Sequence, residues 1–365
     1  MKNRTEGIRI NGHNYREDKL DVLIAEKLSS PHLPDWEVEL FTFLQIWFSS
    51  SKTILAQTSG STGEPTSIEL PKQVMIKSAE RTIQYFGLKK GNRILLSLPC
   101  RYIAGKMMVV RAIVGKMDLI TVDPSSEFEL LLNDPFEFGA MVPNQVFKLL
   151  EVPSGIEKLE HIHNLLIGGS AIPSTMETTI SQLKSRVVST YGMTETASHI
   201  AIRELSGNKR SDIYHCLPGI RVTLSENDCL QIHVTEGHEP LQTNDMAEVL
   251  SPNSFRILGR ADDMIISGGI KYWPQEIEKK LEALIPARFV ISAIADEKLG
   301  EKLVLVIEDT PADIDWIHQK ATELLSPFER PKSIYFLEKF PQTPNGKLRR
   351  NEIKWRIQDN TNYTN

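Results

Sequence analysis

Apolar residues recur along the chain at two spacings, and their alternation predicts the order of helices and strands. Residues 34–50 place Leu40, Phe43 and Trp47 on one stripe at helical spacing, which predicts a packed N-terminal helix. Short unbroken apolar runs, such as Arg93–Leu98, predict buried strands instead. The helical spacing also predicts helices over residues 74–86 and 103–114, and two more that begin at Pro143 and Pro173. Further strands are predicted over residues 118–122, 139–142, 164–167 and 186–190.

Strands that alternate with helices imply a parallel sheet with crossover helices. Gly87 and Gly115 are expected to end two of those helices. Beyond Asp262 the order changes to a helix, two short strands, a second helix and a last strand, which suits a small α+β domain of roughly one hundred residues. We therefore expect an α/β protein. A large N-terminal domain of parallel-rich sheets, with a shortened first subdomain, would cover residues 1–260, and a small α+β lid domain residues 261–365.

Composition narrows the class of protein. A chain of 365 residues favours about two domains. The net charge of −5 argues against a general nucleic-acid binder. Cys100, Cys216 and Cys229 lack the spacing of a zinc site or a disulfide framework, so they indicate thiols in a reducing compartment. The N-terminus has no signal-peptide core, and no apolar run reaches the roughly 18 residues that span a membrane. We expect a cytoplasmic protein.

Gln57–Ile68 (QTSGSTGEPTSI) is a run of hydroxyls and glycines with almost no apolar content. Successive backbone N–H groups and hydroxyls in such a run can surround an anion, which predicts a phosphate-binding loop. The spacing is not that of a Walker loop. The alternative is a plain flexible loop. The residues proposed to hold phosphate are Thr58, Ser59, Gly60, Ser61, Thr62 and Gly63.

Two polar segments follow predicted strands, at the carboxyl ends where ligands gather in parallel sheets. They are Gly168-Gly169-Ser170 and Tyr191–Ser198 (YGMTETAS). A carboxylate beside phosphates is repulsive unless it holds a divalent cation, so Glu195 is a candidate Mg²⁺ ligand. The alternative is a helix start that carries Thr194 and Glu195 in its first turn.

Three further segments carry candidate chemistry. Asp245, which we expect on a loop, could accept the hydroxyls of a ribose, although Asp-containing turns are common. Gly259–Glu278 supplies Arg260, two carboxylates at the domain junction and a Ser-Gly-Gly turn. Lys347 follows an Asn-Gly turn near the C-terminus, where a lysine is more often a solvated charge.

Five segments in this order resemble the adenylate-forming superfamily of acyl- and aryl-CoA ligases, carrier-loading adenylation domains and luciferases. They are TSGSTGEP, YGMTETAS, TNDMAEV, GRADDMIISGG and PQTPNGK, and they extend from about Ala56 to the C-terminus. Within that superfamily, Leu98–Ala112 and Leu165–Pro173 look most like the ligases that act on o-succinylbenzoate in menaquinone biosynthesis.

The resemblance implies a ligase that uses ATP and Mg²⁺ to convert a carboxylic acid to an acyl-adenylate and then transfers the acyl group to CoA. It implies that Thr194 contacts the α-phosphate, Glu195 holds Mg²⁺ and Lys347 acts during adenylation. Asp262 would be the hinge of the lid domain. The remaining nucleotide contacts would be Gly168, Gly169, Ser170, Thr190, Tyr191, Gly192, Asp245 and Arg260, and the CoA contacts Ser267, Gly268 and Gly269.

Arg111 is the candidate for substrate choice. It lies on a predicted helix that is otherwise mostly apolar, and a buried arginine needs an anionic partner, which the second carboxylate of o-succinylbenzoate would provide. The alternative is a helix-face arginine paired with a neighbouring Asp or Glu. The other residues assigned to the acyl pocket are Tyr102, Ser198, His199 and His215, with Tyr102 in place of the histidine common in the family.

Other functions stay open from the sequence. The acceptor could be a carrier protein instead of CoA, and the acid could be another aryl or acyl carboxylate. A non-catalytic nucleotide-binding relative belongs to a different class, but such a protein has no need for Lys347. Only about fifty residues precede the glycine-rich run, fewer than is typical of the family, so a homodimer that covers an exposed surface is a further alternative.

Overall fold

The structure is a computed structural model that describes residues 7–57, 67–125, 134–234, 239–282, 284–285, 287–308, 314–342 and 348–359. Its internal contacts divide the chain into two compact units. The first comprises Met1–Ile172 and Thr179–Ile220, and the second Pro173–Thr178 and Arg221–Asn365. The division that we expect at residues 260 and 261 stays a prediction.

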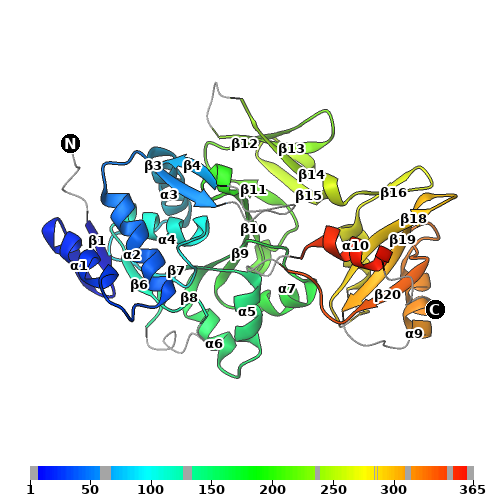
Figure 1. Cartoon of the computed structure of the whole chain (residues 1–365), viewed down its shortest axis with the longest axis horizontal. Coiled ribbons are helices and arrows are strands. Elements are labelled where there is room, and N and C mark those ends of the chain that lie inside the picture. The colour runs from blue at the N-terminus through cyan, green and yellow to red at the C-terminus, as the bar shows by residue number, and fades with distance from the viewer. Residues whose placement is uncertain are drawn as a thin grey trace. The chain divides into compact units, whose positions relative to one another are not determined.

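The first unit is built on a sheet whose strand order is β11-β10-β9-β8-β7-β5-β6-β1-β2. The pairs from β9 through β8, β7 and β5 to β6, and on to β1, are all parallel. β7, β8 and β9 lie side by side in this unit (Figure 1). The strands are β1 (Gly7–Ile10), β2 (His13–Arg16), β5 (Arg93–Leu96), β6 (Asp118–Thr121), β7 (Phe136–Met141), β8 (Ile162–Ile167), β9 (Arg186–Gly192), β10 (His199–Glu204) and β11 (Tyr214–Cys216). The expected α/β class with a parallel-rich sheet is confirmed.

Helices lie between the strands of this unit. They are α1 (Asp18–Leu28), α2 (Asp35–Phe48), α3 (Lys72–Phe86), α4 (Ile103–Gly115), α5 (Pro143–Leu150), α6 (Gly155–Glu160) and α7 (Ser174–Ile180). The apolar spacing predicts all of these except α1 and α6. Helix α4 packs on α3, β1, β5 and β6, and Met107–Ile113 is buried without interruption.

The residue that ends α4 differs from the prediction. Gly87 ends α3 in the left-handed conformation (φ 63°), as expected. In α4, however, the left-handed residue is Lys116 (φ 51°), and Gly115 still belongs to the helix. A Cβ atom on Gly115 would lie 2.8 Å from Cε of Met117 and 3.2 Å from Cδ1 of Ile83. Position 115 therefore favours glycine because the side chains of Met117 and Ile83 approach it closely.

The glycine-rich run connects the two strands of a separate hairpin. β3 (Thr53–Gln57) pairs antiparallel with β4 (Ser67–Pro71), and Gln57 lies opposite Ser67. Nζ of Lys72, directly after β4, donates to the carbonyl oxygens of Ile46 (2.9 Å) and Trp47 (2.7 Å) at the C-terminal end of α2. This lysine therefore ties the hairpin to the N-terminal helix.

The second unit contains two sheets. The first is antiparallel, with the order β12 (Arg221–Leu224), β13 (Cys229–His233), β14 (Leu241–Ser251) and β15 (Ser254–Arg260). The second has the order β17-β16-β19-β18, and β20 pairs with β19. Its strands and the helices beside them are β16 (Ile265–Ser267), β17 (Ile270–Tyr272), α8 (Pro274–Leu281), β18 (Phe289–Asp296), β19 (Gly300–Glu308), α9 (Ile314–Leu324), β20 (Ser333–Leu337) and α10 (Arg350–Asp359). Ile277 and Leu281 of α8 and Ile317 of α9 share one apolar core with this sheet, as an α+β module requires.

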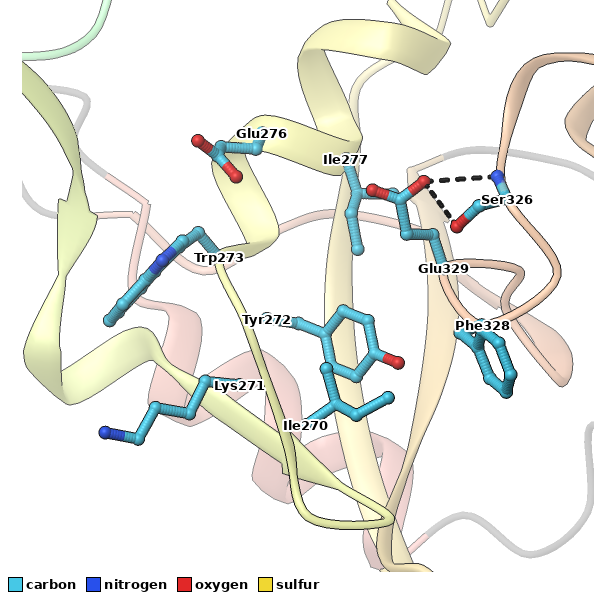
Figure 2. Close-up of a pocket in the computed structure, with 9 residues that line it drawn as sticks. All are labelled: Ile270, Lys271, Tyr272, Trp273, Glu276, Ile277, Ser326, Phe328 and Glu329. Atoms are coloured by element: carbon cyan, nitrogen blue, oxygen red, sulfur yellow. Dashed lines mark hydrogen bonds between the residues drawn. The ribbon is translucent and has the colours of Figure 1, made fainter.

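A cavity of about 320 Å³ opens in the second unit (Figure 2). Tyr272 and Ile270 lie next to each other in it, and Glu329 accepts hydrogen bonds from the backbone N–H (3.1 Å) and Oγ (2.9 Å) of Ser326 at its rim. The lining residues are Ile270, Lys271, Tyr272, Trp273, Glu276, Ile277, Ser326, Phe328 and Glu329. Among the helices that the structure describes, none is long and apolar enough to cross a membrane.

Candidate functional site

The carboxyl ends of β8 and β9 bring two of the predicted segments together. These strands are parallel neighbours, with Ile167 opposite Ser189, so Gly168 and Thr190 follow at the same edge of the sheet. A Cβ atom on Gly168 would lie 2.2 Å from Oγ1 of Thr190, and Gly169 adopts a φ of +93°. The backbone of this segment therefore runs close to β9 and turns sharply, which leaves its polar groups at the sheet edge where nucleotides bind in parallel sheets.

Tyr191 is held from the side by a second tyrosine. Its ring centroid lies 5.9 Å from that of Tyr214 on β11. The hydroxyl of Tyr214 lies 2.9 Å from Oγ of Ser189, and the guanidinium of Arg203 lies over the Tyr214 ring at 5.6 Å. Tyr191 thus has a supported aromatic ring of the kind that can stack on a base.

A short 3-10 turn, Thr194–Thr196, carries the candidate phosphate and metal ligands. The side chain of Thr196 organises it: Oγ1 accepts from the backbone N–H of Met193 (3.1 Å) and lies 2.6 Å from the carbonyl oxygen of Ser198. Thr196 is buried, whereas Thr194 and Glu195 are half-exposed. The short turn agrees with the alternative of a helix start, and it leaves both side chains available to a ligand.

Gly192 makes the approach of β10 to this turn possible. A Cβ atom there would lie 2.4 Å from the carbonyl oxygen of Ser198 and 2.5 Å from Cα of His199, both backbone atoms that have no alternative rotamer. We expect Gly192→Ala to lower the free energy of unfolding by about 3 kcal/mol, the upper part of the usual range for overpacking. Denaturant unfolding measures the change.

Gly207→Ala is the matched control for that variant. Gly207 has a φ of +69° with nothing within 4 Å of an added Cβ, so only backbone strain applies, about 1 kcal/mol. Equal losses in the two variants would show that the contact with residues 198 and 199 is not what requires glycine at position 192.

Arg111 lies at the centre of a buried polar cluster. Only 2% of its surface is exposed, and Nη2 donates to Oγ of Ser198 (2.6 Å) and lies 3.4 Å from Nδ1 of His199. Its guanidinium also lies over the ring of Phe138 at 5.8 Å, and Nε has no hydrogen-bond partner among the described residues. No ion pair to Arg111 occurs within the ranges that the structure describes, so the ion-paired arginine of the alternative is not observed there. Burial lowers the pKa of Arg111 from 12.5 to about 9.

Two of the other residues assigned to the acyl pocket, Tyr102 and His215, lie apart from this cluster. Tyr102 precedes α4, nine residues before Arg111, which corresponds to about 13 Å along a helix at 1.5 Å per residue. His215 lies on β11 opposite Ile202, and its side chain is exposed. Ser198 and His199 are thus the predicted residues that contact Arg111.

Asp245 and Arg260 lie opposite each other in the second unit, on β14 and β15. Nη1 of Arg260 lies 3.1 Å from a carboxylate oxygen of Asp245, and Nη2 lies 2.9 Å from one of Asp262. Asp262 also accepts from Nδ2 of Asn244 (3.3 Å). The expectation that Asp245 lies on a loop is wrong, because β14 is an eleven-residue strand paired on both sides.

The Ser-Gly-Gly turn closes a two-residue β-hairpin. Ser267 of β16 lies opposite Ile270 of β17, and Gly268 (φ +59°) and Gly269 (φ +81°) form the loop between them. Two successive positive φ angles require glycine or a similar residue in a hairpin of this length. Ile270 is also the first residue that lines the cavity of Figure 2.

The chemistry of Mg²⁺ is compatible with Glu195. This ion is usually held by one or two carboxylates together with substrate phosphates, so a single half-exposed carboxylate suffices. Within the part of the chain that the structure describes, no three His, Cys, Asp or Glu side chains gather to hold a metal by themselves. The phosphate loop Thr58–Gly63 and Lys347 lie outside the described residues.

Residues 51–235 match the family described as AMP-binding enzyme. The chain is 32% identical to an acyl-CoA synthetase (AMP-forming)/AMP-acid ligase II-like protein from Dyadobacter fermentans, whose crystal structure it matches with a TM-score of 0.60 over 92% of this chain and 97% of that one.

Other relatives are named for a particular acid. The chain is 23% identical to the 2-succinylbenzoate–CoA ligase of Lactococcus lactis over 93% of this chain and 81% of that protein. The corresponding ligase of Escherichia coli is 26% identical over 86% and 70%. The structure of the o-succinylbenzoate CoA synthetase of Bacillus subtilis, in complex with its acyl-adenylate intermediate, matches with a TM-score of 0.69 and 22% identity, over 82% of this chain and 68% of that one.

Proposed function

The chain belongs to the AMP-binding enzyme family, and on this premise we propose that it joins a dicarboxylic aromatic acid, o-succinylbenzoate, to CoA in a reaction activated by ATP. In the first step a carboxylate oxygen attacks the α-phosphorus, the bond to pyrophosphate breaks, and an acyl-adenylate forms. In the second step the sulfur of CoA attacks the acyl carbon, AMP leaves, and the thiol proton passes to solvent.

The residues of the first unit have separate roles in this proposal. Thr194 binds the α-phosphate, the ring of Tyr191 stacks on the base, and the segment from Gly168 to Ser170 borders the nucleotide. Mg²⁺, when bound through Glu195, neutralises charge that develops on the phosphates. In the second unit Asp245 and Arg260 bind the ribose, Ser267–Gly269 meets the pantetheine arm, and Lys347 stabilises the negative charge on the α-phosphate during adenylation.

One observation supports the choice of a dicarboxylic acid. Arg111 is a buried cation without a carboxylate partner among the described residues, and a buried charge is strongly destabilising unless it is paired. One carboxylate of the substrate must react with ATP, so only a second carboxylate can pair with Arg111. The names of the 2-succinylbenzoate–CoA ligases that resemble this chain point to the same class of acid.

A release assay tests the proposal. We expect pyrophosphate from ATP only when Mg²⁺ and o-succinylbenzoate are both present, and a thioester only when CoA is added. Benzoate and medium-chain fatty acids, which lack the second carboxylate, are the matched controls. Pyrophosphate release with the monocarboxylic acids but not with the diacid would refute the substrate assignment.

Two further outcomes distinguish the alternatives. Adenylate formation without transfer to CoA would favour a carrier protein as the acceptor. Binding of ATP without pyrophosphate release for any acid would favour a non-catalytic relative.

A further inference from the structure

We propose that His199 and Thr82 are positioning residues for substrate recognition: together they fix the guanidinium of Arg111 where it meets the second carboxylate of the acid. This inference rests on the proposed function, and it assigns a role to two residues that do not themselves touch the substrate. The three side chains come from different elements of the first unit, α3, α4 and β10, so the fold has to bring them together.

The contacts form one continuous chain of hydrogen bonds. Nη2 of Arg111 lies 3.4 Å from Nδ1 of His199, and Nε2 of the same ring lies 3.3 Å from Oγ1 of Thr82. Oγ1 of Thr82 lies in turn 3.2 Å from the backbone carbonyl oxygen of Ser78, one turn earlier in α3. All four residues are buried, with Thr82 fully so, and water therefore does not replace any of these partners.

The identity of the donors follows from the arginine. A guanidinium has five N–H donors and no acceptor, so Nδ1 of His199 must accept from Arg111. The proton of the neutral ring then lies on Nε2 and is donated to Thr82, whose hydroxyl proton is left for the carbonyl oxygen of Ser78. Each of these three hydrogen bonds has one donor and one acceptor, and the donors follow one direction, from Arg111 through His199 and Thr82 to Ser78.

A protonated ring does not fit this arrangement. It would place an N–H group at Nδ1 against the N–H groups of Arg111, and two donors would then face each other. Burial and, after it, the charge of Arg111 lower the pKa of His199 well below its usual value of 6.5, so the neutral ring is the stable form. Arg111 requires the tautomer with the proton on Nε2, and Thr82 supports that tautomer by accepting this proton.

These hydrogen bonds fix the orientation of the Arg111 guanidinium. Ser198 and His199 together hold Nη2, while Nε has no partner in the part of the chain that the structure describes and the flat face lies against Phe138. Arginine binds a carboxylate best through two parallel N–H groups, which demands a fixed guanidinium plane. Removal of the His199 acceptor frees this plane to rotate, and the acid then binds to a less ordered partner.

The test uses three variants of the full chain. We expect His199→Phe to raise the KM for o-succinylbenzoate roughly 5- to 10-fold, the loss of about one hydrogen bond, while the KM for ATP and the kcat for adenylation stay within 2-fold. Thr82→Val should change the same KM in the same direction and by less. His199→Gln keeps an acceptor for Arg111 and a donor for Thr82, and should recover most of the affinity.

Two matched controls make similar substitutions of a histidine and a threonine that do not contact Arg111. His163→Gln alters an exposed histidine on β8. Thr322→Val removes a hydroxyl that bonds to the carbonyl oxygen four residues earlier (2.8 Å), as the hydroxyl of Thr82 does, but on an exposed face of α9. Both should leave the KM for the acid unchanged.

The tautomer is measured without any substrate. In protein labelled with ¹⁵N-histidine, nitrogen shifts should show the neutral ring of His199 with its proton on Nε2, and Thr82→Val should weaken this preference without reversing it, because Arg111 still donates to Nδ1. A proton on Nδ1, or equal effects of His199→Phe on the KM for the acid, the KM for ATP and kcat, would overturn the inference.

The same measurement applies if His199→Phe fails to fold, since it uses the wild-type chain and Thr82→Val. An unchanged tautomer and an unchanged KM in Thr82→Val would then overturn the role of Thr82. If the wild-type enzyme shows no preference for a diacid, the proposed function fails, whereas the nitrogen shifts still decide the arrangement of His199.

Discussion

The Arg111→Ala variant is expected to lose roughly 10- to 150-fold in KM for o-succinylbenzoate while its KM for ATP stays nearly unchanged. The range corresponds to about 1.5–3 kcal/mol, the usual contribution of a hydrogen bond to a charged group. In the proposed complex Arg111 contacts only the acid, so its removal should not change the KM for ATP. Steady-state kinetics with each substrate varied in turn measure both constants.

Two controls accompany this variant. Arg93→Ala removes an arginine that also lies over a phenylalanine of β7, at 4.9 Å from Phe136, but is paired with Asp134 near the surface. It should leave the KM for the acid unchanged. Arg111→Met fills most of the space of the arginine, and it separates the loss of charge from the cavity that alanine creates. Equal losses for acid and ATP, or reduced stability with normal kinetics, would identify Arg111 as structural.

Lys347→Ala should have the largest effect of all, and on one half-reaction only. The resemblance to the adenylate-forming superfamily assigns Lys347 to the charge that develops on the α-phosphate, and the loss of one such group typically slows the step about 100- to 1,000-fold. Thioester formation from acyl-adenylate that is supplied ready-made should continue at the normal rate. Pyrophosphate release and thioester formation, measured separately, give the two rates.

Lys339→Ala is the control, because Lys339 is an exposed lysine of the same module. A rotation of the lid domain at Asp262 would bring Lys347 to the site for adenylation and the Ser267–Gly269 turn for thioester formation. If Lys347→Ala slowed the two half-reactions equally, Lys347 would have no step-specific role, and this exchange would be refuted.

The hinge itself can be tested at Asp262, which lies in the 3-10 turn Ala261–Asp263. Asp262→Pro fixes a backbone dihedral and should spare adenylation but block thioester formation if it locks the adenylating arrangement. The substitution also removes the contacts of the carboxylate with Arg260 and Asn244. Asp262→Ala removes the same contacts and leaves the dihedral free, so a difference between the two variants reports on the backbone.

The elements of the first unit were predictable because the apolar spacing is strong there. α3 and β5 lie within a few residues of their predicted bounds, and Gly168 and Tyr191 stand at strand ends as expected. Asp245 was misplaced because Asn and Asp are common in turns, whereas pairing with β13 and β15 keeps the segment extended. The preference of Asn and Asp for turns is weak compared with backbone pairing to a strand on each side.

Of the two supporting residues of the site, His199 was assigned to the acyl pocket from the sequence, whereas Thr82 was not found. Thr82 does carry a signal: it lies at helical spacing from Met75, Ser78 and Ala79, so the buried face of α3 includes two hydroxyls that need partners. What the sequence does not contain is the identity of those partners. His199 lies 117 positions away from Thr82, and only the packing of α3 against β10 brings the two side chains into contact.

The charge of Arg111, which has no carboxylate partner among the described residues, also affects the stability of the folded chain. Its folded-state pKa of about 9 lies below the ordinary 12.5, so the unfolded chain holds this proton more firmly, and at neutral pH the charge reduces the free energy of unfolding. In the proposed complex a dianionic acid would supply the counter-charge and bind the folded state alone, which would raise that free energy as its concentration increases. The substrate would then also stabilise the folded enzyme.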